Sequence, residues 1–285
     1  MLDGYRLKAL RIEGTQLHYI DHGAGEPIIF IHGSLNDYRS WSKQFEAFAE
    51  HYHVVAYSRR YHYPNEIASS ATEAPVTQQR DDLASLIQLL GLAPAYLVAS
   101  SFGAYVSLLL AAQYPDLVRA IILGGPPLFP LLPPEDFHQF ETEVFAPSRQ
   151  ALDQGNVQEG IRIFLDGIIE VGFFNRLPPD SRQHILDNAS SFILEQNTPI
   201  DQHFYPFSPS DLSKVKAPTL IIIGDHSPPF LRQSSAALAN LLPDVEQTVI
   251  PGASHGGLHN QNPSVYNEVV LGYLKRRFVT GSSTR

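Results

Sequence analysis

Ser101 stands at a spacing that suits a catalytic nucleophile. It lies in the segment Ala95–Tyr105, where an apolar run leads directly into a helical pattern through Ala-x-Ser-x-Gly. Ala99 and Gly103 flank the serine, and only small residues fit where a strand and a helix cross closely. Such a turn exposes the hydroxyl at the carboxyl edge of a sheet and points the dipole of the new helix at it. An ordinary helix start is the alternative interpretation.

Two backbone N–H groups can stabilise negative charge next to this serine. Phe102 follows Ser101 directly, and the apolar run at 27–31 ends in His32-Gly-Ser34, which opens a loop toward the same sheet edge. The amides of Ser34 and Phe102 are therefore predicted to form an oxyanion hole, in which one donor contributes about 3–4 kcal/mol. For His32 we favour a structural role that fixes the loop over a role as a base.

A general base is expected among the 12 histidines, and position distinguishes His255 from the others. It follows Gly252 in a Gly-x-x-His loop, after the predicted strand Gln247–Ile250 and before a terminal helical pattern. A base on a loop at the carboxyl edge of the sheet can keep one imidazole nitrogen on the serine. His259 is the weaker candidate and is predicted to be a surface or pocket residue.

The elements that must position these residues alternate between strands and helices. Continuous apolar runs at 27–32, 53–57, 95–99, 118–123 and 219–223 predict strands that are buried on both faces. Amphipathic patterns predict helices over Gln79–Leu90, with Gly91 as a stop signal, and over Val265–Phe278. This βαβα order predicts an α/β fold with an open, mostly parallel sheet and right-handed crossovers.

The segment 126–209 shows no strand pattern. It carries 11 of the 22 prolines and 10 of the 16 phenylalanines, and helical patterns cover Val157–Val171 and Ser181–Phe192. We predict a core domain at 1–125 and 210–280, a helical cap inserted at 126–209, and a flexible tail at 281–285. For most of the phenylalanines we favour a role in holding the insertion together; the alternative is that they line an apolar pocket.

Composition excludes several classes of protein. The chain of 285 residues has 44% hydrophobic and 17% charged residues, which argues against disorder. With 29 acidic and 20 basic residues it lacks the positive charge of a nucleic-acid binder. The absence of cysteine excludes disulfides, zinc–thiolate sites and a cysteine nucleophile. No signal pattern or membrane-spanning run is visible, so a soluble, cytoplasmic protein without a membrane partner is expected.

Across residues 10–278 the chain resembles the α/β-hydrolase superfamily, in its serine-nucleophile, esterase-like branch with a helical cap. His32-Gly33, the Ser101 turn and His255 occur in the order of that family. The resemblance implies a mostly parallel, eight-stranded sheet flanked by helices, with a cap inserted after the sixth strand. It also implies Ser101 as nucleophile, His255 as base, an acid between them in sequence, and no metal or organic cofactor.

The position of that acid departs from the family pattern. The acid usually lies three residues after a glycine at the end of the seventh strand, and here Ser227 occupies that position. Asp225 is the carboxylate in this turn and is predicted as the third catalytic residue; the alternatives are that it caps the turn or that Ser227 orients the imidazole. The other family position, at 124–127, holds no acid. We expect Asp225→Asn to lower kcat far more than Ser227→Ala.

A second departure lies in the segment Tyr57–Asn65. Many relatives have a glycine-rich Asp-x-x-Gly-x-Gly-x-Ser loop here, whereas this chain has Tyr61 and Tyr63 in place of both glycines and retains arginines at 59 and 60. Arg59 and Tyr61 are candidate substrate-binding residues, the arginine for an anion. The interpretation we favour is a stiff structural loop whose arginines form salt bridges.

The leading hypothesis is a serine hydrolase that cleaves a small to medium carboxylic ester, apolar or aromatic, through an acyl-enzyme. Haloalkane dehalogenases and epoxide hydrolases share the fold, but the resemblance implies an aspartate nucleophile for them. Carbon–carbon bond hydrolysis and lactone hydrolysis stay open, because both use a serine. The alternative is a binding protein: an α/β-hydrolase scaffold that binds a small apolar ligand without hydrolysis. The motive for it is that position 227 holds a serine where the family usually has the catalytic acid.

Overall fold

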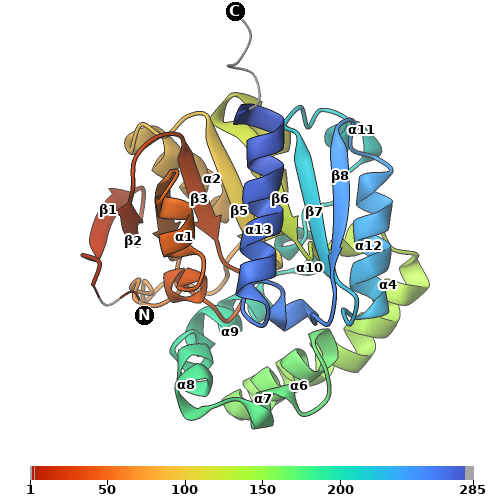
Figure 1. Ribbon diagram of the computed structural model, residues 1–285. Coiled ribbons are helices and arrows are strands. Elements are labelled where there is room, and N and C mark those ends of the chain that lie inside the picture. The colour runs from red at the N-terminus through yellow and green to blue at the C-terminus, as the bar shows by residue number, and fades with distance from the viewer. Residues whose placement is uncertain (1, 3, 280–285) are drawn as a thin grey trace, which may run out of the picture.

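The apolar runs predicted as strands lie side by side in one sheet, as the computed structural model shows for residues 2 and 4–279 (Figure 1). The predicted tail at 281–285 lies outside the described residues. The eight strands have the order β1-β2-β4-β3-β5-β6-β7-β8. β1 pairs with β2 and β2 with β4 in antiparallel fashion, and all other pairs are parallel. The predicted α/β fold with a mostly parallel sheet is therefore confirmed. The strands are β1 (Lys8–Ile12), β2 (Thr15–His22), β3 (Pro27–Ile31), β4 (His53–Tyr57), β5 (Ala95–Ser100), β6 (Val118–Gly124), β7 (Thr219–Gly224) and β8 (Val245–Ile250).

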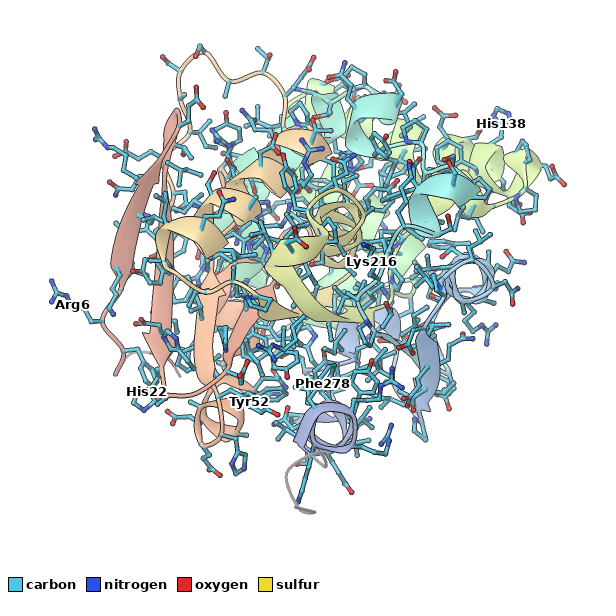
Figure 2. All side chains as sticks on the ribbon, turned by 90° about the horizontal axis from the view of Figure 1, so that it is seen from above. Arg6, His22, Tyr52, His138, Lys216 and Phe278 are labelled. Atoms are coloured by element: carbon cyan, nitrogen blue, oxygen red, sulfur yellow. The ribbon has the colours of Figure 1, made fainter. Side chains whose placement is uncertain are left out.

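Helices cover both faces of the sheet, which explains why the central strands are apolar throughout. Ile29 and Ile31 of β3 belong to the core under α2, α3 and α12, whereas Ile28 and Phe30 belong to the core under α1 and α13. Figure 2 looks along the sheet and shows α13, near Phe278, on one side and α2 and α3 on the other. These helices are α1 (Phe45–Ala49), α2 (Val76–Leu89), α3 (Phe102–Gln113), α12 (Pro229–Ala239) and α13 (Pro263–Leu274).

Phe278, which follows α13, is held on the sheet by aromatic rings. It contacts Tyr96 of β5 with the ring centres 5.1 Å apart, and Tyr96 contacts Tyr52 at 6.0 Å. Figure 2 shows Phe278 and Tyr52 close together on the face covered by α13. Tyr266 and Val270 of α13 are buried in the same core, so this helix packs on the same face of the sheet.

Between β6 and β7 the described chain forms helices and turns. Figure 1 shows α6 to α9 as a layer below the sheet, beyond the lower ends of its strands. The helices of this segment are α4 (Pro134–Phe140), α5 (Ala146–Asp153), α6 (Val157–Ile168), α7 (Phe173–Arg176), α8 (Pro179–Asp187), α9 (Ala189–Asn197), α10 (Ile200–His203) and α11 (Pro209–Leu212). We refer to residues 126–209 as the helical segment.

The helical pattern at 181–192 is interrupted at Asn188, where α8 ends and α9 begins. The side chain of Asn188 accepts a hydrogen bond from the Tyr63 N–H at 2.9 Å and donates one to Asp37 Oδ2 at 2.8 Å. Both partners lie outside the helical segment, in the loops after β3 and β4. Contacts with distant parts of the chain, which the sequence periodicity does not encode, therefore interrupt the helix.

In the part of the chain that the structure describes, no helix combines the length and the apolar character needed to cross a bilayer.

Candidate active site

Ser101 forms the sharp turn between β5 and α3. Its backbone has φ 51° and ψ −123°, and residues other than glycine rarely adopt such a positive φ. Gly103 packs against the end of β3, since a Cβ at Gly103 would lie 2.4 Å from the His32 carbonyl oxygen and 2.5 Å from that of Ile31. The small residue that the sequence places two positions after the serine is therefore required by the close approach of helix and strand.

His255 meets this serine from the loop after β8. Its Nε2 lies 3.0 Å from Ser101 Oγ, so the structure brings the two predicted residues together. Burial alone lowers the pKa of His255 to about 4. The imidazole is therefore neutral at pH 7, and Nε2 accepts the hydroxyl proton when Nδ1 carries the ring hydrogen.

The other nitrogen of His255 faces the backbone of Gly125. Nδ1 is buried and has no hydrogen-bond partner among residues 2 and 4–279. A Cβ at Gly125 would lie 2.6 Å from it, so the chain after β6 occupies this side of the ring. The imidazole thus lacks the orienting acceptor of a complete triad.

The expected hydrogen bond between Asp225 and His255 is not formed. The Asp225 N–H lies 3.4 Å from the Ile250 carbonyl, which continues the pairing of β7 with β8, and its side chain is 44% exposed. One of its carboxylate oxygens lies 4.0 Å from Nε2 of the neighbouring His226. Ser227, the alternative, is buried and its hydroxyl accepts a hydrogen bond from the Gly224 N–H at 3.2 Å. Backbone pairing therefore fixes Asp225 in the turn and away from the imidazole.

The loop after β3 lies against the nucleophile. A Cβ at Gly33 would lie 2.9 Å from Ser101 Cβ and 3.6 Å from Ser101 Oγ. Ser34 and Phe102 both line the cavity at this serine. Phe102 is the first residue of α3, so its N–H has no acceptor within the helix. The two predicted oxyanion donors therefore lie next to Ser101.

His32 holds this loop in place. Its Nδ1 lies 2.8 Å from the Gly33 carbonyl oxygen and its Nε2 accepts a hydrogen bond from the Arg59 N–H at 2.9 Å. Burial, together with the positive charge of Arg59, lowers the pKa of His32 well below its usual value. The ring is thus a neutral link between two loops, as the structural interpretation expects.

The two candidate substrate-binding residues lie elsewhere. Arg59 and Tyr61 are absent from the cavity-lining residues of the described chain. Arg59 is 1% exposed and pairs with Glu195 at 3.0 Å, as the favoured interpretation of a structural loop with salt bridges expects. The ring of Tyr61 lies 5.8 Å from the guanidinium of Arg60. The candidate role of these two residues in substrate binding is therefore not supported at this cavity, and for Arg59 the reason is that a buried carboxylate binds the guanidinium.

His259 is a core residue. Its ring stacks on Trp41 with the ring centres 4.3 Å apart, and it is 8% exposed. The expectation of a surface or pocket position is therefore wrong, because the indole covers the imidazole.

The cavity at Ser101 is apolar and small. Seven phenylalanines line it, among them Phe129, Phe145 and Phe164 of the helical segment. Its volume of about 30 Å³ holds a few water molecules, since one needs about 10–15 Å³. Ligand pockets usually measure about 300 Å³ or more. Side chains or helices must therefore move before a substrate can enter.

Sequence reasoning missed two polar residues of this cavity, Gln196 and His203. Both come from the helical segment, where helix packing decides which side chains face the serine. Their spacing in the sequence carries no signal that would have identified them.

Residues 26–260 match the family model described as alpha/beta hydrolase fold. Epoxide hydrolase 3 of Mus musculus is 31% identical over 122 residues, which cover 42% of this chain and 33% of that protein. The Uncharacterized hydrolase YraK of Bacillus subtilis is 31% identical over 132 residues, 46% of this chain and 49% of that protein. The chain thus spans between a third and a half of the length of these relatives.

Solved structures resemble nearly the whole chain. The bromoperoxidase from Bacillus anthracis has a TM-score of 0.77 at 24% identity, covering 95% of this chain and 100% of that one. A thermophilic esterase from Thermogutta terrifontis has a TM-score of 0.74 at 23% identity, covering 95% and 98%. At these identities the likeness shows the fold alone. Because the family model matches most of the chain, this protein belongs to the alpha/beta hydrolase fold family.

Proposed function

We propose that this protein is a serine hydrolase that cleaves small to medium carboxylic esters through an acyl-enzyme. The observation that carries the proposal is the 3.0 Å contact between Ser101 Oγ and the neutral His255 Nε2, on a strained turn at the cavity. A nucleophile within hydrogen-bond distance of a base is the arrangement that acyl transfer needs.

In the proposed reaction, Ser101 Oγ attacks the ester carbonyl carbon while His255 Nε2 takes the hydroxyl proton. The carbonyl oxygen becomes an oxyanion, which the Ser34 and Phe102 N–H groups stabilise. The C–O bond then breaks, and the leaving alkoxide receives the proton from His255. Water repeats these steps on the acyl-enzyme, releases the acid and restores the serine.

Phenylalanines around the serine favour an apolar or aromatic ester. In this proposal the helical segment acts as a cap, which must open to admit the substrate. Esters are favoured over epoxides, in spite of the relative named Epoxide hydrolase 3, because the turn carries a serine and not an aspartate. Lactones and carbon–carbon substrates require the same serine chemistry.

The second candidate is a scaffold that binds a ligand without hydrolysis. His255 Nδ1 has no hydrogen-bond partner among the described residues, which favours this candidate, because loss of the orienting acid costs about 10⁴ in kcat in a Ser-His-Asp triad. A fold with an inactive serine would still enclose an apolar ligand.

A fluorophosphonate probe separates the two candidates, because it reacts only with an activated serine. We expect labelling and slow hydrolysis of p-nitrophenyl butanoate by the wild type, both lost in Ser101→Ala. Ser100→Ala changes the preceding serine and is expected to retain both. A folded wild type that is neither labelled nor active would contradict the hydrolase and support the binding scaffold.

A further inference from the structure

The cavity wall combines many phenyl rings with two polar side chains that the proposed reaction does not use. Gln196 lies in α9 and His203 at the end of α10, and both line the cavity that contains Ser101. Apart from the oxygens of its reacting ester group, an apolar ester offers these side chains nothing to bind. Their presence therefore bears on which substrate the cavity accepts.

Both side chains are buried, and one polar atom of each lacks a hydrogen-bond partner among the described residues. Gln196 is 3% exposed and its Oε1 has no hydrogen bond; His203 is 5% exposed and its Nδ1 has none within the described part of the chain. A buried polar atom without a partner destabilises a fold, and native proteins contain few of them. Two such atoms on residues of one cavity mark a polar part of its wall, which a polar group of a ligand can satisfy and which water can satisfy while the cavity is empty.

The imidazole of His203 is held rigidly. It stacks on Phe102 with the ring centres 4.6 Å apart and meets Phe204 edge-on at 4.5 Å. Phe102 is also the residue whose N–H is proposed to bind the oxyanion. His203 therefore lies beside the reacting groups, with the ring plane fixed before a substrate arrives.

His203 is an uncharged binding group. Glu195 is paired with Arg59 at 3.0 Å, and both are fully buried. Burial lowers the pKa of His203 to about 4, with Arg59 and Arg149 acting in the same direction and Glu195 in the opposite one, so the ring is neutral at pH 7. A neutral imidazole and a neutral amide can bind a neutral hydrogen-bonding group without the cost of burying an unpaired charge.

We propose that Gln196 and His203 form a polar subsite that binds a hydroxyl group of the substrate. A hydroxyl donates one hydrogen bond and accepts others, so it satisfies the amide in either orientation and the imidazole in either tautomer. The substrate is then an ester that carries a hydroxyl within an otherwise apolar acyl or alcohol part. This inference rests on the proposed function for the reaction, but the binding it describes is measurable without turnover.

Two matched pairs of esters test the subsite, each with a hydroxyl replaced by a methyl group. The acyl pair is p-nitrophenyl 3-hydroxybutanoate and 3-methylbutanoate; the alcohol pair is 4-(hydroxymethyl)phenyl and 4-ethylphenyl butanoate. Their Kd values are measured by calorimetry on Ser101→Ala, which cannot hydrolyse them. We expect about tenfold tighter binding of the hydroxylated ester in one pair, because the methyl analogue leaves the buried polar atoms without a hydrogen bond.

Variants then assign the preference to the two side chains. His203→Phe keeps the ring stacking and Gln196→Met keeps the length of the side chain; each, added to Ser101→Ala, is expected to reduce the preference to about twofold or less. Ser235→Ala removes another buried, unpartnered hydroxyl on a residue outside the cavity lining and is expected to leave the preference unchanged. No preference in either pair, or a preference that survives both variants, overturns the subsite. Turnover by the wild type reports separately on the proposed hydrolase.

Discussion

Proton transfer from Ser101 depends on an imidazole that is a weak base. Its pKa of about 4 results from burial, and its Nδ1 has no acceptor among the described residues that would stabilise the imidazolium formed during the reaction. A triad carboxylate supplies that stabilisation and fixes the tautomer. We therefore expect acylation by this protein to be slow, because Ser101 is held next to a base but that base takes up a proton only weakly.

Asp225 is the first residue at which sequence and structure give different expectations. Its carboxylate is 44% exposed and lies by His226, so Asp225→Asn is expected to keep kcat/KM within about threefold of the wild type. Rates of p-nitrophenyl butanoate hydrolysis check this. A loss of a hundredfold or more would show that Asp225 reaches His255 during the reaction, as the sequence predicts.

Gly125 is predicted to be essential, because it leaves room for the imidazole. A Cβ there would lie 2.6 Å from His255 Nδ1, so Gly125→Ala is expected to displace the ring and lower kcat by about a hundredfold or more. Gly91→Ala is the matched control. Gly91 has φ +66° against +55° for Gly125, and its Cβ would meet nothing within 4 Å. Equal activity losses in the two variants would assign the effect to backbone strain.

At the scale of elements, the central strands were predictable because burial on both faces leaves a continuous apolar run. The predicted His53–Tyr57 strand coincides with β4, and the Ser101 turn follows from small flanking residues. β1 and β2 were not predicted individually, because β1 in particular is largely exposed and mixes polar with apolar residues. The break at Asn188 and the cavity positions of Gln196 and His203 depend on contacts between distant segments, which periodicity does not encode.

A buried ion pair attaches α9 to the core. Glu195 Oε1 accepts a hydrogen bond from Arg59 at 3.0 Å and lies 3.2 Å from His62 Nε2. Burial raises the pKa of Glu195, but Arg59 and His62 outweigh it and hold that pKa well below its usual range. The carboxylate therefore stays charged and keeps the helical segment docked on the loop after β4.

Removal of this carboxylate is expected to destabilise the protein strongly. Glu195→Ala leaves the Arg59 charge buried without its anion, so the free energy of unfolding in urea should fall by about 3–5 kcal/mol. Glu159→Ala, which removes an exposed partner of Arg162 in the same segment, should cost about 1 kcal/mol or less. Similar losses in the two variants would mean that the buried pair contributes no more than a surface pair.

At the scale of the whole molecule, buried neutral histidines link stability to pH. Burial lowers the pKa values of His203, His255 and His259 to about 4, and those of further histidines fall as well: His32, His62 and His184. In the unfolded chain a histidine titrates near 6.5. Between about pH 6.5 and 4 the unfolded state therefore binds more protons than the folded state.

The sign of this difference predicts loss of stability on mild acidification. The stabilisation is complete above about pH 6.5 and decreases as the pH falls toward 4, by up to about 1.4 kcal/mol per pH unit for each histidine. Asp37 is an acid and behaves differently. Burial raises its pKa, but Arg39 and His184 outweigh burial and lower it. The stabilisation that its carboxylate provides is therefore lost only when the pH falls below the usual pKa of an aspartate. The urea midpoint is therefore expected to fall clearly between pH 7 and 5, before the carboxylates titrate.

His259→Phe removes the contribution of one histidine to the pH dependence of stability without changing a residue that lines the cavity. The phenyl ring can replace the imidazole in the stack on Trp41, so the variant should fold, and its free energy of unfolding should depend on pH with a slope lower by about one proton between pH 6 and 5. Urea titrations of wild type and variant at several pH values measure this slope directly. A wild-type midpoint that is flat from pH 7 to 5 would mean that the histidines are hydrated in solution and that the core around Trp41 and His255 admits water.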